Sequence, residues 1–284
     1  MNKYEINLKN KIKNNKNEAG ALMQRTGFKH ANLILMLLLT LFVSTLIFQI
    51  ITHTDPVSLI TNIISLEIQF AIRLSLLTSA ISTLMCILIA VPVSYSLARY
   101  HFRGKAIINT VLDLPMALPP IVAGLGLLLI FGTTSVGSFL ADVGLKFVFT
   151  VPGIIMAQFA VNISLMLRIM RSTFEGINPR YEHVAQTLGC TPFQAFIRTT
   201  LPLSKNGMIA GSVITWSRGM GEFGAVLMLA GATRMKTETL PIALYLNMSS
   251  GELDLAIAAA TILILISGVT LYLFERKGGL AKLY

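Results

Sequence analysis

Long apolar runs constrain this chain more than any other feature of its sequence. Each run is close to the roughly 20 residues that an α-helix needs to cross the hydrocarbon core of a bilayer. Charged residues make up only 13% of the chain, about half of the share that is usual for a soluble domain. The sequence therefore predicts an all-α membrane protein with six transmembrane helices. The predicted spans are Leu33–Ile51, Glu67–Ala98, Leu112–Phe131, Val148–Arg168, Gly207–Ala230 and Leu253–Phe274.

The basic residues outside the spans are unevenly distributed. Of the 23 Lys and Arg residues, 18 lie in the terminal segments and in alternate loops, whereas the other loops hold only Lys146, Arg234 and Lys236. The positive-inside rule places the side that is rich in Lys and Arg in the cytoplasm. This predicts a multi-pass protein of the plasma (inner) membrane with both termini cytoplasmic, and it explains the charge of +10 without nucleic-acid binding. The predicted organisation is a basic cytoplasmic tail over 1–30, a membrane domain over 31–275 and a second cytoplasmic tail over 276–284.

Motifs of catalytic and cofactor sites are missing from the sequence. The four histidines are scattered without the spacing of metal ligands. The Gly104–Lys105 pair lacks the first glycine and the following hydroxyl residue of a phosphate-binding P-loop. The Gly-x-Gly-x-x-Gly pattern over 219–224 lies within a span, where small residues favour close helix packing over dinucleotide binding. We predict a chain that is not an enzyme and that holds no metal or cofactor.

The cytoplasmic loop 172–205 carries explicit signals for two short helices. Asn178, followed by a proline, is a typical start, and Gly189 is a typical stop. Thr191, followed by a proline and then by a glutamine at the third helical position, predicts a capping box for the second helix. Pro202 is expected to follow the end of that helix.

Both predicted helices are amphipathic, with apolar residues at three- and four-residue spacing. Such stripes either dock a cytoplasmic partner or pack against the membrane ends of the same chain, and the spacing alone leaves both alternatives open. The first stripe is Tyr181, Val184, Ala185 and Leu188, and the second is Phe193, Phe196, Ile197 and Leu201.

Residues 182–189 read Glu-His-Val-Ala-Gln-Thr-Leu-Gly, which resembles the coupling loop, or EAA motif, of permease subunits of binding-protein-dependent ABC importers. In that family the loop inserts into a groove of a separate ATP-hydrolysing subunit. This chain departs from the family at His183 and Val184, where Glu and Ala are usual, with a glutamate immediately before. The resemblance implies that the chain couples to the ATPase through 175–202. The residues implied in coupling are Glu182, His183, Ala185, Gly189, Phe196, Leu201 and Pro202.

Other segments are similar to the molybdate/tungstate permeases, with the sulfate permeases as close relatives. These segments are Asp113–Leu114–Pro115, Leu118–Pro119–Pro120, the run from Gly219 to Ala225 and the run from Thr239 to Tyr245. The resemblance implies a type I importer permease (MetI-like) fold. It also implies two copies of an ATPase that binds ATP and Mg, and an extracytoplasmic protein that delivers molybdate or tungstate. Six helices leave little room for a complete pathway, so size and resemblance both favour a homodimer with the pore at its two-fold axis.

Two charges in the fifth predicted span invite two interpretations. Arg218 and Glu222 are four residues apart, so they can share one helix face and neutralise each other. Alternatively, Arg218 lines a route for a dianion, helped by the hydroxyl groups of Ser212, Thr215 and Ser217. Either arrangement avoids an unpaired charge facing lipid, which costs about 2.5–3.5 kcal/mol near the middle of a bilayer.

Three prolines within spans predict helix breaks or gate hinges, because proline removes a backbone donor. They are Pro92, Pro119 and Pro120. Three alternative functions remain open. A sulfate/thiosulfate permease differs only in substrate. A secondary anion transporter works without an ATPase but needs a coupling-ion site and usually repeated halves. A structural or assembly factor needs no polar residues in the fifth span.

Overall fold

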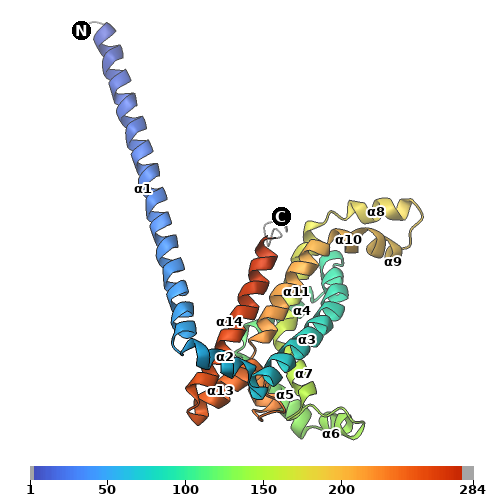
Figure 1. Ribbon diagram of the computed structural model, residues 1–284. Helices are drawn as coiled ribbons and strands as arrows, with labels where there is room; N and C mark the ends of the chain where they lie inside the picture. Colours follow the sequence, from blue (N-terminus) through green and yellow to red (C-terminus); the bar gives the residue numbers. More distant parts are fainter. Residues whose placement is uncertain (1–2, 277–284) are drawn as a thin grey trace. The chain divides into compact units, whose positions relative to one another are not determined.

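The computed structural model describes residues 3–276, with side chains described from Phe28 onward. It divides into two units, residues 1–53 and 54–284, and contains no strand in its described part (Figure 1). The helices are α1 (Lys3–Thr52), α2 (Pro56–Ile64), α3 (Leu66–Arg99), α4 (Lys105–Ala117), α5 (Pro120–Thr133), α6 (Ser135–Asp142), α7 (Val151–Gly176), α8 (Arg180–Thr187), α9 (Pro192–Ala195), the π-helical turn η1 (Phe196–Thr200), α10 (Leu201–Leu203), α11 (Lys205–Met220), α12 (Gly224–Ala230), α13 (Leu240–Ser250) and α14 (Leu253–Arg276).

The first unit consists of helix α1, whose part over Phe28–Thr52 is long and apolar enough to cross a membrane. Its described side chains are almost all exposed, as befits a helix that is apolar on every side. The hydroxyls of Thr40 and Thr45 each donate to the carbonyl four residues earlier at 2.8 Å, so these polar groups are satisfied without water. This confirms the first predicted span.

The second unit contains helices α3, α7 and α14, which are also candidate spans, and the pair α4–α5. By length and apolarity, four described helices qualify as spans, or five if the bent α4–α5 pair is one span. The fifth predicted span, Gly207–Ala230, is not one continuous helix, because α11 ends at Met220 and α12 begins only at Gly224. Glycine has a low helix propensity, and the glycines around this break weaken a continuous helix. The predicted tail beyond Arg276 lies outside the described residues.

The chain bends by 109° between α4 and α5, at the predicted proline pair. Pro119 adopts an extended conformation (φ −55°, ψ 132°), as expected for a residue that precedes another proline. The predicted break is therefore confirmed here. At Pro92 the helix α3 continues to Arg99, so the helix does not break there, and a gate hinge at that position stays a prediction. Beyond Pro92, α3 is held against α7, since the Ser94 hydroxyl donates to the Leu167 carbonyl at 2.9 Å.

The two helix breaks lie beside each other. A Cβ on Gly224 would be 3.1 Å from the Ile121 nitrogen and 3.4 Å from Pro120 Cβ. One turn further along α5, a Cβ on Gly124 would be 2.7 Å from Ala225 Cα, so only glycine permits this approach of α5 to α12. The interrupted helices are thus packed together by their backbones.

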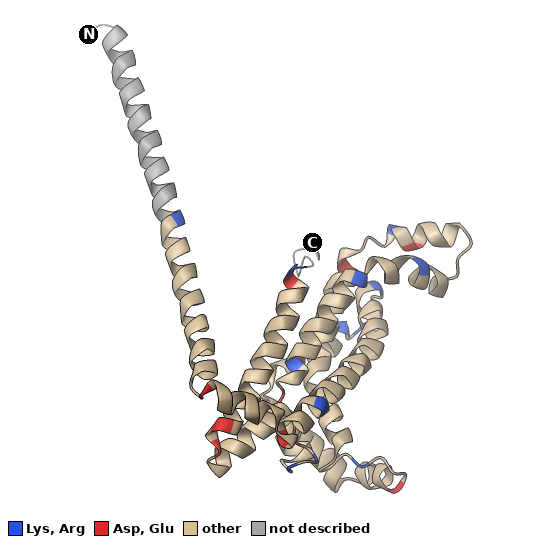
Figure 2. Ribbon diagram, in the orientation of Figure 1, with Lys and Arg blue, Asp and Glu red and all other residues tan. Residues whose placement is uncertain are grey.

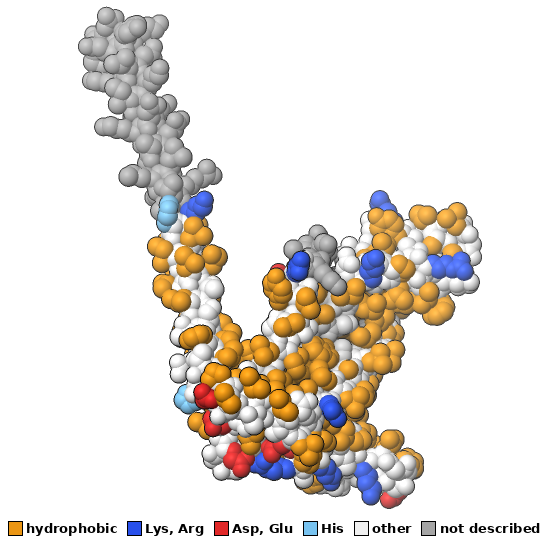
Figure 3. Space-filling view, in the orientation of Figure 1, with side chains coloured by type: hydrophobic (Ala, Val, Ile, Leu, Met, Phe, Trp, Pro, Cys, Tyr) orange, Lys and Arg blue, Asp and Glu red, His pale blue; other side chains and the backbone are white. Residues whose placement is uncertain are grey.

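Charged residues concentrate at the two ends of the second unit. Figure 2 shows Lys and Arg residues gathered around α8–α10 and the neighbouring helix ends, and most Asp and Glu residues at the opposite end. Apolar side chains cover much of the surface between these ends (Figure 3). This distribution fits helices that pass through lipid between two polar surfaces.

Candidate functional site

The first helix of the loop 172–205 forms as predicted and becomes α8. The Asn178 Oδ1 atom accepts a hydrogen bond from the Arg180 nitrogen at 3.0 Å, which satisfies one of the free amides at the helix start. Gly189 ends the helix in the left-handed conformation, with φ +91°. The Cys190 nitrogen then donates to the Ala185 carbonyl at 3.1 Å, which closes the C-terminal cap.

The second helix starts as predicted but does not end there. Thr191 and Gln194 form both hydrogen bonds of the capping box, at 2.9 and 3.3 Å. The chain then passes through the π-helical turn η1 into α10, where Pro202 lies inside the helix instead of after its end. Because Pro202 has no N–H to donate, a regular α-helical turn would leave an unpaired carbonyl before it. A π-helical turn is a known way to accommodate such an interruption.

The loop exposes most of its predicted apolar stripes. The side chains of Leu188 and Phe193 are 81% and 72% exposed, and Figure 3 shows apolar side chains over this part of the loop. Phe196 differs, because its ring is half-buried with its centre 4.5 Å from that of Tyr95. Ala185 and Leu201 are also half-buried. We define the docking face as the exposed set Tyr181, Val184, Leu188, Phe193 and Ile197.

Glu182 points away from the docking face and is only 5% exposed. Its Oε1 atom forms an ion pair with Arg99 Nε at 2.8 Å and accepts from the Thr200 hydroxyl at 2.8 Å. Its Oε2 atom accepts from the Tyr95 hydroxyl at 2.7 Å. We call these four side chains the Glu182 anchor. It joins α8 to the end of α3 and to η1.

Arg99 also binds the end of α7. Its Nη1 atom donates to the Phe174 carbonyl at 2.9 Å, and its Nη2 atom donates to the Ile177 carbonyl at 3.0 Å. Carbonyls at a helix C-terminus lack partners within the helix and favour a nearby cation. The guanidinium therefore binds α7 and α8 at once, and each of its three nitrogen atoms donates a hydrogen bond.

Electrostatics keep the Glu182 carboxyl ionised. Burial alone would raise its pKa, but hydrogen bonds from Tyr95, Thr200 and Arg99, together with the positive charge of Arg99, bring the pKa below its ordinary value. Sequence reasoning placed Glu182 among the coupling residues and missed its partners. The available signal was a Tyr and an Arg four residues apart at the cytoplasmic end of the second span.

Arg218 and Glu222 form no direct ion pair, because they do not share a helix, although the charge of Arg218 still acts on the Glu222 carboxyl. Glu222 lies beyond the end of α11, and its Oε1 atom accepts from the Ala225 nitrogen at 3.0 Å, which caps the start of α12. Arg218 is exposed and forms no ion pair with any residue that the structure describes. The alternative, that Arg218 lines a route for an anion, stays a prediction.

The three hydroxyl residues predicted beside Arg218 have different surroundings. Thr215 is fully buried, with its hydroxyl 3.8 Å from Met166 Sδ. Ser212 donates to the Met208 carbonyl at 2.7 Å and lines a pocket of 350 Å³ between α3 and α11. Ser217 is half-buried. The structure of this chain does not assemble them into one site.

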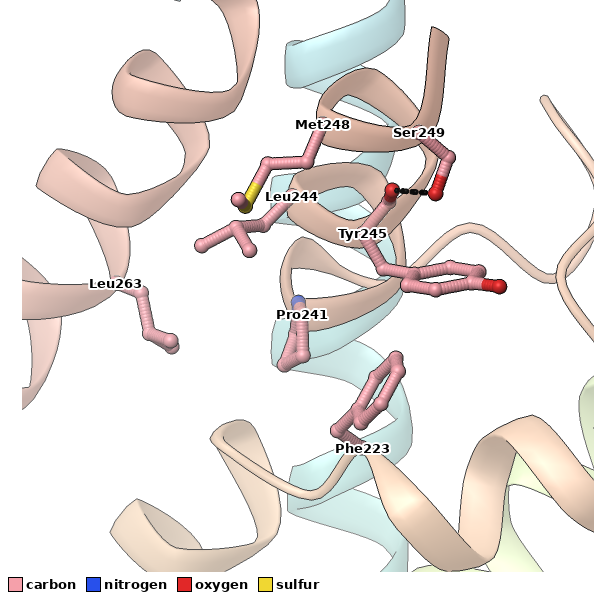
Figure 4. A pocket seen from close by; sticks show the side chains of 7 residues that line it. All are labelled: Phe223, Pro241, Leu244, Tyr245, Met248, Ser249 and Leu263. Carbon is pink, nitrogen blue, oxygen red and sulfur yellow. Dashed lines mark hydrogen bonds between the residues drawn. The ribbon is translucent and has the colours of Figure 1, made fainter. Parts of the chain in front are cut away.

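A larger pocket of 470 Å³ lies beside the break between α11 and α12. Figure 4 shows Leu263 of α14 facing α13 across this pocket, with Phe223 at one end. The rings of Phe223 and Tyr245 are 5.3 Å apart. The Ser249 hydroxyl donates to the Tyr245 carbonyl at 2.8 Å. A lining of this kind suits an apolar group and not an oxyanion. Among the described residues, no cluster of His, Cys, Asp or Glu is arranged to hold a metal ion.

Comparison with known proteins identifies the family. Residues 90–276 match the model of the family described as binding-protein-dependent transport system inner membrane component. The sulfate transport system permease protein CysW of Synechocystis sp. is 36% identical over 208 residues, which cover 73% of this chain and 75% of the relative. The molybdenum transport system permease protein ModB of Mycobacterium tuberculosis is 35% identical over 202 residues, covering 71% and 76%.

Solved structures show the same fold at lower identity. The crystal structure of a bacterial alginate ABC transporter, in complex with a periplasmic protein bound to an alginate pentasaccharide, contains a chain that superposes with a TM-score of 0.61 at 18% identity. The superposition covers 85% of this chain and 94% of that one. The fold is therefore that of an ABC transporter permease, and this chain belongs to the family of binding-protein-dependent transport system inner membrane components.

Proposed function

We propose that this chain is the pore-forming permease subunit of an ATP-driven importer for molybdate or tungstate. The chain works as a homodimer and catalyses no covalent chemistry, since ATP and Mg bind to two partner ATPase subunits. The observation that carries this proposal is the docking face, an exposed apolar surface on two capped helices that project from the membrane helices. An extracytoplasmic binding protein for molybdate or tungstate delivers the substrate. Both termini lie in the cytoplasm, in keeping with the cations around α8–α10 (Figure 2).

The exposure of the docking face supports ATPase binding. Leu188 and Phe193 expose most of their side chains, and burying a residue of this type contributes roughly 1.5–3 kcal/mol. Exposed apolar patches that project into water are typical of protein interfaces. The caps at Asn178 and Thr191 hold both helices in shape before a partner binds, so little ordering cost remains for binding.

Arg218 supports a second copy and a central pathway. Its side chain is exposed within the fifth predicted span and unpaired among the described residues. Facing lipid, such a charge costs about 2.5–3.5 kcal/mol. A neighbouring copy of the chain, with a water-filled route between the copies, removes this cost and places a cation where an oxyanion passes.

The choice of substrate rests on the segments Gly221–Ala225 and Thr239–Tyr245, which resemble the molybdate/tungstate permeases. Similar identities to CysW and ModB support a sulfate/thiosulfate permease as the alternative. A secondary anion transporter that needs no ATPase is the alternative of another class. The docking face argues against it, since such a transporter has no use for this surface.

A transport assay separates these functions. The chain is reconstituted in vesicles with its ATPase and binding protein, and uptake of radioactive molybdate is measured with and without ATP. We expect molybdate uptake to depend on ATP. An excess of tungstate should suppress this uptake, whereas the same concentration of sulfate should not. Suppression by sulfate alone would favour the sulfate alternative, and uptake that persists without the ATPase would favour the secondary transporter.

A pair of matched variants tests the docking face. Leu188→Asp places a charge within this face, whereas Gln186→Asp places the same charge two residues earlier, at an exposed polar position of α8. We expect Leu188→Asp to reduce ATPase co-purification at least about tenfold, since an apolar side chain of this size contributes roughly 1.5–3 kcal/mol on burial. Gln186→Asp should behave like the wild type. Equal co-purification of both variants would contradict the assignment.

A further inference from the structure

Helix α8, together with its C-cap residue Leu188, carries three of the five docking-face residues but makes few contacts with the membrane helices. It packs chiefly against α9 and η1, which belong to the same projecting loop. Its polar connection to the membrane helices is Glu182, whose carboxylate binds Arg99 and Tyr95 near the end of α3. Glu182 thus gives α8 a direct polar link to α3, beside its covalent connection to α7.

The two helices of the loop have different covalent connections: α8 follows α7 after residues 177–179, which include the Ile177 carbonyl that Arg99 binds. The second helix of the loop reaches α11 through the π-helical turn η1 and then through Pro202. These elements interrupt the regular hydrogen-bond ladder of an α-helix. Thr200 in η1 is also bound to Glu182, at 2.8 Å. Both arms of the loop thus converge on the same carboxylate.

The anchor has the properties of a stiff connection. Each of the three nitrogen atoms of the Arg99 guanidinium donates a hydrogen bond, to Glu182, Phe174 and Ile177 respectively. The side chains of Arg99 and Glu182 are only 9% and 7% exposed, so solvent screening is weak. Planar, charge-assisted hydrogen bonds of this kind fix direction as well as distance. The anchor thus connects α8 to the cytoplasmic ends of α3 and α7 together.

We propose that the Glu182 anchor transmits movement of the docked ATPase to the membrane helices, so that Arg99 and Glu182 are positioning residues for ATP-driven transport. The inference rests on the proposed function, because it requires an ATPase on the docking face. It adds that docking and transmission are separate: the docking face holds the ATPase, and the anchor passes its movement on.

The variant Glu182→Gln tests this separation, because it keeps the size of the side chain and removes its charge. ATP hydrolysis and molybdate uptake are measured in the same vesicles, with the ATPase and the binding protein present. We expect ATPase co-purification and hydrolysis to persist while uptake per ATP hydrolysed falls about tenfold, within the range for mutations that weaken coupling between sites. Thr200→Val, which removes one hydrogen bond and leaves the ion pair, should give a smaller fall in the same ratio.

Asp113→Asn is the matched control. Asp113 pairs with Arg171 at 3.2 Å and with Arg168 at 3.6 Å, so this variant breaks ion pairs between α4 and α7 without touching the docking loop. Its uptake per ATP should equal that of the wild type. An unchanged ratio in Glu182→Gln, a proportional fall in uptake and hydrolysis, or loss of the bound ATPase would each overturn the inference. A wild-type chain that binds no ATPase would overturn the proposed function, and this inference with it.

Discussion

The two ends of the second unit hold charged clusters of opposite character. The Glu182 anchor is buried, and every oxygen of its carboxylate has a donor. At the other end, Arg234 binds Glu67 at 2.7 Å and Glu252 at 3.5 Å, but its side chain is 40% exposed. Glu238, next to it, is fully buried. We call Glu67, Arg234, Glu238 and Glu252 the Arg234 cluster.

The Arg234 cluster contains buried carboxylate oxygens without hydrogen-bond donors among the described residues, whereas both carboxylate oxygens of the Glu182 anchor have donors. The Oε1 atoms of Glu67 and Glu238 are buried and have no donor in the described part of the chain. Burial raises the pKa of the Glu238 carboxyl to about 7, and Glu67 raises it as well, although the Met235 amide and Arg234 oppose the rise. A proton on Glu238 lets the two carboxyl groups share a hydrogen bond. The anchor is thus a permanent connection, whereas the Arg234 cluster responds to pH.

The largest effect is expected from Arg99→Met, which removes the cation of the anchor. Glu182 then stays buried without its charge partner, the Ile177 carbonyl loses its Arg99 donor, and the Phe174 carbonyl keeps only the Ile177 amide. Breaking a buried pair in this way costs about 3–5 kcal/mol, measured as loss of unfolding free energy of the purified protein in detergent. In the double variant Arg99→Met with Glu182→Leu, much of this loss should be recovered, because no unpaired charge remains.

Gly189 offers an intermediate effect within the docking loop. A Cβ there meets nothing within 4 Å, so the cost of Gly189→Leu is backbone strain at φ +91°, about 1–2 kcal/mol. The membrane helices should stay folded while ATPase co-purification falls. Gly189→Asn, which tolerates this conformation better, should lose less. Equal loss in both variants would point to the side chain instead of the backbone.

Glu238→Gln tests the pH response of the Arg234 cluster. A carboxyl whose pKa is raised in the folded state stabilises that state below its ordinary pKa, and this stability is lost as pH rises through about 7. The thermal midpoint of the wild type should therefore fall between pH 5 and pH 8, and Glu238→Gln should flatten the change. The anchor behaves in the opposite sense, since the lowered pKa of Glu182 leaves it intact across this range and weakens it only in more acidic solution. A wild-type midpoint that rises over the same range would contradict the assignment.

The smallest effect is expected from Arg234→Met. Ion pairs as exposed as this one contribute about 0–1 kcal/mol, because water and salt screen them. The unfolding free energy should therefore change by far less than in Arg99→Met. If Arg234→Met lowered the free energy of unfolding as much as Arg99→Met does, the proposed difference between the two clusters would be wrong.

Local signals allowed the docking loop to be predicted from sequence. Asn178, Gly189 and the pair Thr191–Gln194 act through neighbours within a few residues, so their spacing specifies their caps. The prolines at 119 and 120 likewise specify a break, because they change the backbone itself. The period of the apolar residues identified the two stripes, but their exposure is known only from the structure.

Long-range contacts were beyond such reasoning. Arg99 and Glu182 are 83 residues apart, and nothing in their spacing shows that they meet. The interruption of the helix within the apolar run from Gly207 to Ala230 was not predicted, because hydropathy carries no information on backbone hydrogen bonds. The expected pairing of Arg218 with Glu222 failed for the same reason, since it assumed a continuous helix through Gly221.

Cross-linking tests the central claim, that the docking face binds the ATPase, most directly. A photoreactive amino acid is placed at position 188 in one sample and at the exposed position 236 in another, each co-expressed with the ATPase subunit. The account predicts a product that contains both chains from position 188 and none from position 236. A product from position 236 and none from position 188 would contradict it.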